Sequence, residues 1–496
     1  MCKICDSVRD NQHSIHKQSN AGQAWINSLT SSVDKVVNNS VQMPAHAGNP
    51  GSKVLIRGGN ILTMDDQLRD FEGGDLLIEG NKIVAIGYNL DATGAEVIDA
   101  KGKIVMPGFI DTHHHQFETA LRSTLVNGML VDDGTEQGKI NYLSHILGKF
   151  APVYRPEDVY ASELFGSLSQ LDAGVTTVLD VSQIHHSPEH TDAAVEALKD
   201  AGRRSVLGYF EGHGEGYQYP EDAYRVRERH FSSNDQLVTM AMGGEVYLPT
   251  WERAWQIAKD LDLNVALHVV GSMGMAEHME RIATSGLLTD RHLLIHMTGM
   301  SDVTWAAARD AGSKVSLAVP IEMTMRHGTP PIQKTLEMGM LPSFSSDVEC
   351  TLTADFFTQM RSALTLQRGQ IHERALAGEQ DLPALLTARD VIRFATVGGA
   401  EALGLSHRVG SLSVGKAADI LLLDSEALNV APLNNVPGAV VSLMERNNVD
   451  TVIVDGQIKK WKGHLIGVDI PRLTAAITES RNNIFSRAGI KPGLFD

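Results

Sequence analysis

Short apolar runs alternate with helical patterns along the middle of this 496-residue chain. Between residues 108 and 408, segments with helical periodicity, such as Ala193–Ala201 and Val303–Ala311, lie between runs rich in Val, Ile and Leu. The predicted strands are Lys103–Ile110, Thr176–Leu179, Ser205–Tyr209, Val238–Met242, Val265–Val269, Leu293–Met297, Lys314–Val319 and Pro342–Ser345. This alternation predicts repeated βα units.

Eight such units in about 300 residues predict an α/β fold, a (β/α)8 TIM-like barrel. The active site of such a barrel lies at the C-terminal ends of its strands. An open doubly wound parallel sheet is the alternative that the pattern leaves open, because the same units build both folds.

Shorter alternating strands flank this segment on both sides. Val54–Ile56, Gly59–Leu62, Asp75–Ile78, Ile83–Ile86 and Val97–Asp99 precede it, and Ile420–Leu423 and Val452–Val454 follow it. Each set is an unfinished sheet, so we expect the two sets to pair into one small β-sandwich domain. The predicted division is an N-terminal arm over 1–50, the sandwich over 51–107 plus 409–470, the barrel over 108–408, and a C-terminal tail or helix over 471–496.

The composition is typical of a soluble globular protein. Hydrophobic residues make up 43% of the chain, and 43 Lys and Arg stand against 60 Asp and Glu, a net charge of −17. This negative charge argues against nucleic acid or an anionic membrane as a partner. No apolar run approaches the roughly 20 residues that cross a bilayer, and the polar N-terminus lacks the apolar segment of a secretory signal. We therefore expect a cytoplasmic protein that acts on a small molecule.

Three cysteines are too few for a disulfide framework, which fits a reducing compartment. Cys2 and Cys5, followed by His13 and His16, offer four zinc ligands, but their spacing matches no common zinc finger. A disordered or partner-docking arm is the preferred interpretation of this segment.

Ligand-type side chains end several of the predicted barrel strands. His113 and His115 end strand one, and because strand side chains alternate, both project to the same side. His268 ends strand five, His296 strand six and Asp347 strand eight. A single His-x-His arises about once by chance in such a composition, a lone histidine is usually a packed residue, and an aspartate at a strand end can cap the next helix. Four strand ends that meet at one face of a barrel favour a shared site instead.

Three imidazoles and one carboxylate suit a zinc-like divalent ion with a position left open for water. Such an ion lowers the pKa of its water to about 7. Asp347 is then the candidate general base, and His296 is placed to polarise the substrate. His114 points the other way along the strand and is expected to be structural.

In combination these residues resemble the amidohydrolase superfamily, in its branch of cytosine deaminase, guanine deaminase and atrazine chlorohydrolase. The resemblance spans about 53–470 and rests on Pro107–His115, Ala120–Arg122, Gly174–Asp180, His268, His296, Asp347 and Gly410–Asp419. It implies that His113, His115, His268 and Asp347 bind one divalent ion, Zn²⁺ with Fe²⁺ as the alternative, and that His296 is catalytic. Binuclear members end strand four in a carbamylated lysine, and Val238–Val246 contains none. Family members commonly form dimers or tetramers, so a homo-oligomer is expected.

One position departs from the deaminases of this branch. They usually carry a glutamate three residues after the strand-five histidine, and this chain has Gly271 there. Either another acid substitutes, with Glu322, Glu211 and Glu215 as candidates, or the reaction needs no ring protonation. A solvated or helix-capping role is the alternative for each of these glutamates.

The substrate contacts are predicted from the segments beside the ligands. We expect Gln116, Glu322 and His327 to contact the substrate, and Phe117, Met323 and Met325 to line an apolar pocket, although core packing explains the methionines equally well.

The predicted function is metal-dependent hydrolysis of a C–N bond, in an amide, cyclic amide or amidine of a small cyclic or aromatic substrate. Hydrolytic deamination or dechlorination of an N-heterocycle such as a purine, pyrimidine or triazine is the alternative. A binding protein that keeps the ligands and docks through its N-terminal arm is a third possibility, because fold alone does not fix function.

Overall fold

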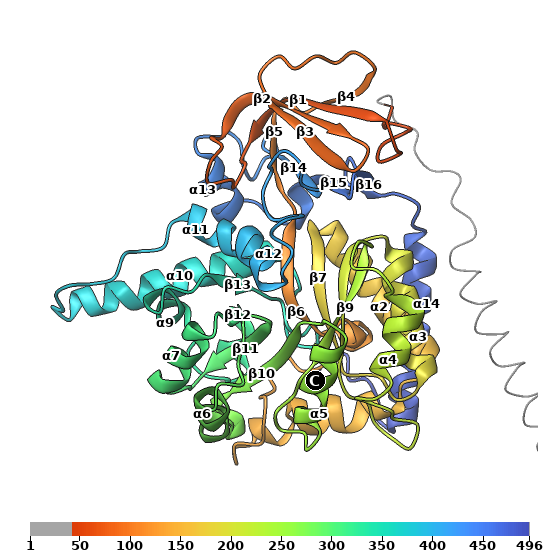
Figure 1. Ribbon diagram of the computed structural model, residues 1–496, viewed down its shortest axis with the longest axis vertical. Helices are drawn as coiled ribbons and strands as arrows, with labels where there is room; N and C mark the ends of the chain where they lie inside the picture. Colours follow the sequence, from red (N-terminus) through yellow and green to blue (C-terminus); the bar gives the residue numbers. More distant parts are fainter. Residues whose placement is uncertain (1–41, 496) are drawn as a thin grey trace, which may run out of the picture.

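A computed structural model of the chain describes residues 42–495, and it contains two sheets (Figure 1). Cys2, Cys5, His13 and His16, and with them most of the predicted arm, lie outside the described residues. In the part that is described, no helix has the length and apolar character needed to span a membrane.

The first sheet is an eight-stranded parallel barrel in the order β13-β12-β11-β10-β9-β8-β7-β6. Its strands are β6 Phe109–His114, β7 Val175–Ser182, β8 Arg204–Tyr209, β9 Val238–Gly243, β10 Val265–Val270, β11 His292–Thr298, β12 Lys314–Leu317 and β13 Pro342–Phe344. A parallel bridge between His114 and Asp347 brings the two ends of the sheet together. The backbone N–H of His115 donates to the Asp347 carbonyl at 2.9 Å. The predicted TIM-like barrel is confirmed, and the open sheet is excluded.

Helices cover the outside of this barrel. They are α2 Pro156–Asp172, α3 Pro188–Ala201, α4 Ala223–His230, α5 Trp251–Asp260, α6 Ala276–Thr284, α7 Asp302–Asp310, α8 Val319–Thr324, α9 Ile332–Glu337, α10 Phe356–Leu376, α11 Ala388–Arg393 and α12 Gly399–Ala402. Short 3-10 or π helices occur in the connections between these elements. They are η1 Gln116–Leu121, η2 Gln137–Lys139, η3 Tyr142–Phe150, η4 Ala151–Val153, η5 Gly271–Met273, η6 Phe394–Gly398 and η7 Arg446–Asn448. The strands are buried on both faces, which explains why they read as continuous apolar runs.

The second sheet combines strands from both ends of the chain. It is a mixed nine-stranded sheet in the order β17-β16-β15-β14-β5-β1-β2-β3, with β4 paired to β1. Its strands are β1 Lys53–Ile61, β2 Phe71–Glu79, β3 Lys82–Gly87, β4 Ala95–Asp99, β5 Lys103–Pro107, β14 Ile420–Asp424, β15 Val449–Val454, β16 Gln457–Trp461 and β17 His464–Leu465. The antiparallel pair β5 and β14 joins the two flanks, and a separate apolar cluster, which includes Ile56, Ile83 and Leu422, fills its core.

The strand predicted over Lys103–Ile110 is wrong in its extent, because the chain changes sheets at Gly108. Residues up to Pro107 pair with β14, and from Phe109 onward they pair with β7. A Cβ atom at Gly108 would lie 2.0 Å from the Thr176 hydroxyl oxygen, so only glycine fits at the crossing. The apolar pattern runs unbroken through this point and gives no sign of the change.

Two more helices complete the fold. α13 Val436–Ser442 lies in the connection between β14 and β15, and α14 Ile470–Ala488 follows the second sheet. α14 packs against α2, where the Ser480 hydroxyl donates to the Asp158 carboxylate at 2.9 Å. The C-terminal segment therefore returns to the side of the barrel (Figure 1).

Candidate active site

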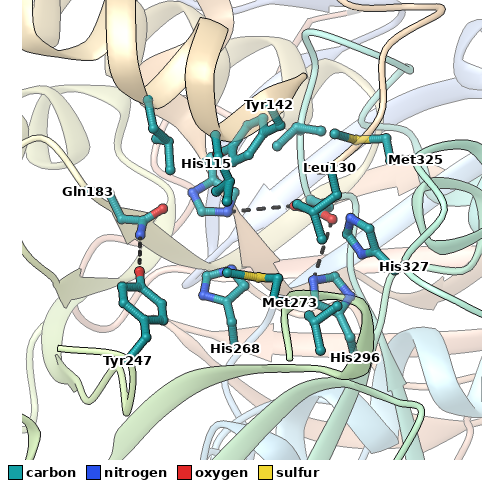
Figure 2. A pocket seen from close by; sticks show the side chains of 15 residues that line it. His115, Leu130, Tyr142, Gln183, Tyr247, His268, Met273, His296, Met325 and His327 are labelled. Carbon is teal, nitrogen blue, oxygen red and sulfur yellow. Dashed lines mark hydrogen bonds and ion pairs between the residues drawn. The ribbon is translucent and has the colours of Figure 1, made fainter. Parts of the chain in front are cut away.

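Four imidazoles and one carboxylate meet at the C-terminal end of the barrel. The Nε2 atom of His113 lies 2.9 Å from Nε2 of His115 and 3.2 Å from Nε2 of His268. The Asp347 carboxylate lies 3.5 Å from His113, 3.6 Å from His115 and 3.7 Å from Nε2 of His296. The structure thus brings together all five residues predicted from the strand ends. Figure 2 shows His115, His268 and His296 of this cluster.

The backbone at two of these residues is in the left-handed region. His296 has φ +72° and Asp347 has φ +61°, conformations that residues with a Cβ atom rarely adopt. Each costs on the order of 1–3 kcal/mol and persists because the surroundings fix it. The side chains at these two strand ends are therefore held by the barrel in orientations that a relaxed strand would not give.

The electrostatics of the cluster fit a cation. Burial, together with the neighbouring histidines, lowers the pKa of both His113 and His115 well below the usual value, so these imidazoles are neutral. Neutral ring nitrogens that face one another at this distance direct lone pairs at a common point. Among the described residues, His113, His115 and His268 form one set able to hold a metal, and His113, His296 and Asp347 form a second, with ligand atoms within 4.8 Å of one another in each. The donor types suit zinc or a similar divalent ion.

A buried carboxylate orients His268. Nδ1 of His268 donates to Glu245 Oε1 at 2.5 Å, which leaves Nε2 with its lone pair toward His113. Burial lowers the pKa of His268, but the Glu245 carboxylate outweighs it and the pKa is raised overall. Glu245 was not among the residues predicted from the sequence, although it lies just after strand four.

We expect Glu245→Gln to weaken zinc binding about tenfold to a hundredfold, because a ligating imidazole held by a carboxylate is a stronger and better oriented ligand. Competition with a metallochromic chelator measures the change. Glu252→Gln, on the exposed face of α5, is the matched control. Unchanged affinity in the Glu245 variant would remove this role.

Glu322 lies behind His296 rather than in the open part of the site. Its Oε1 accepts from the backbone N–H of Ala318 at 2.9 Å and lies 3.1 Å from Nδ1 of His296. Because that oxygen already accepts a hydrogen bond, Nδ1 of His296 is the donor in the second contact. Burial raises the pKa of Glu322 well above its usual value. The predicted substrate contact is thus placed as a support for the His296 ring.

Gln116 is not brought to the site either. It begins η1 and is fully buried, where its amide nitrogen donates to Glu163 at 3.0 Å and its oxygen accepts from Arg203. The side chain of Gln116 joins a polar network between the barrel and α2. Successive side chains at the end of a strand point to opposite sides, so the residue after His115 points away from the cluster.

A cavity opens beside the cluster. It is lined by His115, Leu130, Tyr142, Leu143, Leu147, Gln183, Tyr247, His268, Val270, Met273, His296, Met325, His327, Asp347 and Val348. His327 and Met325 line it as predicted, whereas Met323 is 44% exposed and Phe117 is fully buried, with its ring centroid 6.1 Å from that of His115. Both ring nitrogens of His327 lack a partner among the described residues, and burial, followed by the charge of His268, lowers its pKa to about 3.

Tyr142, which was not predicted from the sequence, lines the same cavity. Its hydroxyl donates to Glu118 Oε1 at 2.6 Å, and burial raises the pKa of Glu118 to about 8. No motif marks this pair, because the two residues come from separate turns, η1 and η3, that meet only in the folded chain.

Comparison with known proteins identifies the family. The model of the amidohydrolase family matches residues 104–459. The chain belongs to the amidohydrolase family. The resemblance seen in the sequence is confirmed, and the chain is a metal-dependent hydrolase with a site that fits a divalent ion.

Several relatives of this amidohydrolase are deaminases. A 5'-deoxyadenosine deaminase of Methanosarcina mazei is 28% identical over 82% of this chain and 92% of its own length. A 5-methylthioadenosine/S-adenosylhomocysteine deaminase of Symbiobacterium thermophilum is 26% identical over 82% of this chain and 93% of its own length.

Solved structures agree with the fold. An adenosine deaminase from Xanthomonas campestris with bound zinc has a TM-score of 0.74 and 24% identity, covering 88% of this chain and all of its own. The zinc complex of the atrazine chlorohydrolase TrzN from Arthrobacter aurescens TC1 has a TM-score of 0.74 and 25% identity, covering 86% and 100%.

Proposed function

We propose that this amidohydrolase hydrolyses the C–N bond of an aminated N-heterocycle and releases ammonia. The observation that carries the proposal is the meeting of His113, His115, His268 and Asp347 beside a cavity lined mainly by apolar side chains. The relatives named as deaminases of adenine nucleosides support a heterocyclic amidine as the substrate.

One divalent ion, Zn²⁺ with Fe²⁺ as the alternative, would be held by His113, His115, His268 and Asp347. When bound, such an ion lowers the pKa of water to about 7 and polarises the electrophile. The neutral imidazoles and the tautomer that Glu245 imposes on His268 are the features of this chain that fit it.

Asp347 is the proposed general base. Its Oδ2 has no hydrogen-bond partner among residues 42–495 and lies on the side of His296. A buried carboxylate in this position takes a proton from the attacking water and delivers it to the departing nitrogen. Without a metal ion, burial raises the pKa of Asp347 to about 7, so its surroundings favour the uptake of a proton.

His296 is the second proposed catalytic residue. Because its Nδ1 donates to Glu322, the neutral ring presents Nε2 as an acceptor beside Asp347. In this tautomer it accepts a hydrogen bond from the water or from the substrate's amino group, and it polarises the substrate only after taking up a proton. Among the predicted substrate contacts, His327 is the one with unpartnered ring nitrogens in the cavity.

Gly271 remains the departure from the usual deaminase site. A Cβ atom there would lie 3.0 Å from the Gly299 Cα and from the Thr298 carbonyl oxygen, so a side chain at this position requires the neighbouring backbone to shift by a few tenths of an ångström. None of the three substitute acids lines the cavity: Glu322 supports His296, Glu211 bonds to Gln183 and Tyr247, and Glu215 is exposed. This absence favours a second candidate function, cleavage of an amide or carbamate-like bond that needs no ring protonation.

Ammonia release by the zinc-loaded protein separates these functions. The panel contains aminated purines, pyrimidines and triazines, chlorotriazines, and aryl amides, with ammonia, chloride and arylamine as the measured products. We expect ammonia from at least one heterocycle; arylamine alone would select the second function, and chloride alone would select dechlorination. No product from any member, or no stoichiometric metal by elemental analysis, would instead favour the binding protein. The expected cytoplasmic location and homo-oligomeric state, a dimer or tetramer, stay predictions, the second of which sedimentation checks.

A further inference from the structure

A polar group of three side chains, Gln183, Glu211 and Tyr247, lies at one end of the cavity. They follow three neighbouring barrel strands, β7, β8 and β9. Figure 2 shows Gln183 and Tyr247 on one side of His115 and His268, with His327 on the other. Apart from Tyr142, His327 and the residues of the cluster, the remaining lining is apolar, so Gln183 and Tyr247 form one polar end of the cavity.

The hydrogen bonds in this group have fixed directions. Oε1 of Glu211 accepts from the Tyr247 hydroxyl at 2.7 Å and from the Gln183 amide nitrogen at 2.9 Å. The same amide nitrogen also donates to the Tyr247 oxygen at 3.1 Å. An ionised Glu211 carboxylate only accepts hydrogen bonds, so the nitrogen of the Gln183 amide, rather than its oxygen, faces it.

The amide oxygen of Gln183 is consequently turned away from its neighbours. In Figure 2 it points away from Tyr247, toward the side on which His115 lies. The residue is only 3% exposed, and its oxygen accepts no hydrogen bond from the rest of the described chain. Because Gln183 lines the cavity, this unpartnered oxygen is free to accept a hydrogen bond from an N–H group of a bound molecule.

We propose that Gln183 binds an N–H donor on the substrate ring, and that Glu211 is the residue that fixes the Gln183 amide for this purpose. The proposal rests on the proposed function and narrows it to heterocycles with a free N–H on the side away from His327. A ring alkylated at that nitrogen leaves the amide oxygen unpaired and brings a methyl group against it. Glu211 touches the amide and not the cavity, so it is a positioning residue.

Pairs of ligands that differ only in a ring N–H or N-methyl group test the proposed role of Gln183. The pairs are cytosine with 1-methylcytosine and adenine with 9-methyladenine, each measured on the zinc-loaded protein. We expect the wild type to prefer the N–H member of at least one pair about tenfold or more in kcat/KM. Gln183→Leu should lower kcat/KM for that member about tenfold to a hundredfold, mainly through KM, and change the methylated member less than about threefold. Gln256→Leu, on the exposed face of α5, is the matched control.

Glu211→Gln provides a second variant that keeps the size of the side chain. Because a glutamine offers both a donor and an acceptor, it no longer forces one orientation on Gln183, and the preference for the N–H member should shrink without reversing. If Glu211 had a purely structural role, its substitution would lower kcat/KM equally for both members of the pair. Melting temperature and zinc content confirm that each variant is folded and loaded, and if Gln183→Leu does not fold, the Glu211 variant carries the test.

Isothermal titration calorimetry with the same pairs tests the role of Gln183 separately from the proposed function. N–H-dependent binding that Gln183→Leu abolishes, without ammonia release from any ring, would refute the proposed function and support the role of Gln183. Ammonia release with equal kcat/KM for both members of each pair would support the proposed function and refute the role of Gln183. Equal binding of both members by the wild type, including no binding of either, overturns the inference.

Discussion

Asp347→Asn should reduce kcat about 1,000-fold or more while the protein keeps its metal. Asparagine preserves the shape of the side chain and one oxygen beside His113 and His115, so it still contributes to the site. It cannot take up the proton of the attacking water or pass it to the leaving nitrogen. Steady-state kinetics on the best substrate of the panel, with elemental analysis of the same sample, measure both quantities.

Asp310→Asn is the matched control, because Asp310 is exposed at the end of α7 and does not line the cavity. It should keep wild-type activity. Full activity in an Asp347→Asn protein that holds a full complement of metal would refute the role of this carboxylate and the mechanism built on it.

His113→Ala should lose bound zinc and, with it, measurable turnover. Nε2 of His113 is the atom shared by both candidate ligand sets and lies within 3.2 Å of two other imidazoles, so its removal opens both sets at once. We expect zinc affinity to fall at least about a hundredfold, because site affinity depends on the number of deprotonated ligands. Elemental analysis after dialysis against a zinc buffer measures the loss.

The exposed His372 on α10 supplies the control His372→Ala, which should keep both zinc and activity. Chelation of the wild type should reproduce the phenotype of His113→Ala, and added zinc should rescue the wild type alone. A variant that retains one zinc per chain would show that His113 is not a ligand.

Much of the fold and part of the site could be predicted from local patterns. The barrel followed from apolar runs spaced by helical segments, and the cluster followed from polar residues at the ends of those runs, such as His268 and His296. Both signals are local, because the period of a strand and the point where it ends depend on residues that are neighbours in the sequence. The change of sheet at Gly108 has no such signal, because both sheets bury the same kinds of residue.

The groups that support the cluster could not be found in this way. Glu245, Glu322 and Glu118 act on residues that are distant in sequence or on another turn, and their partners are fixed by packing. Gln116 shows the converse, since it adjoins His115 in sequence but contacts Arg203 and Glu163 instead. Nearness along the chain predicts a shared site only for residues that project to the same side of a strand.

The pairing of β5 with β14 affects how the protein is made. The ribosome completes β5, and the histidine pair that follows it, about 300 residues before the strand that covers its open edge. During that interval the nascent chain exposes unpaired backbone groups along an apolar strand, the kind of edge that recruits other chains. Translation that ends early, before Ile420, would therefore release a product prone to aggregation even though every proposed metal ligand had already been synthesised.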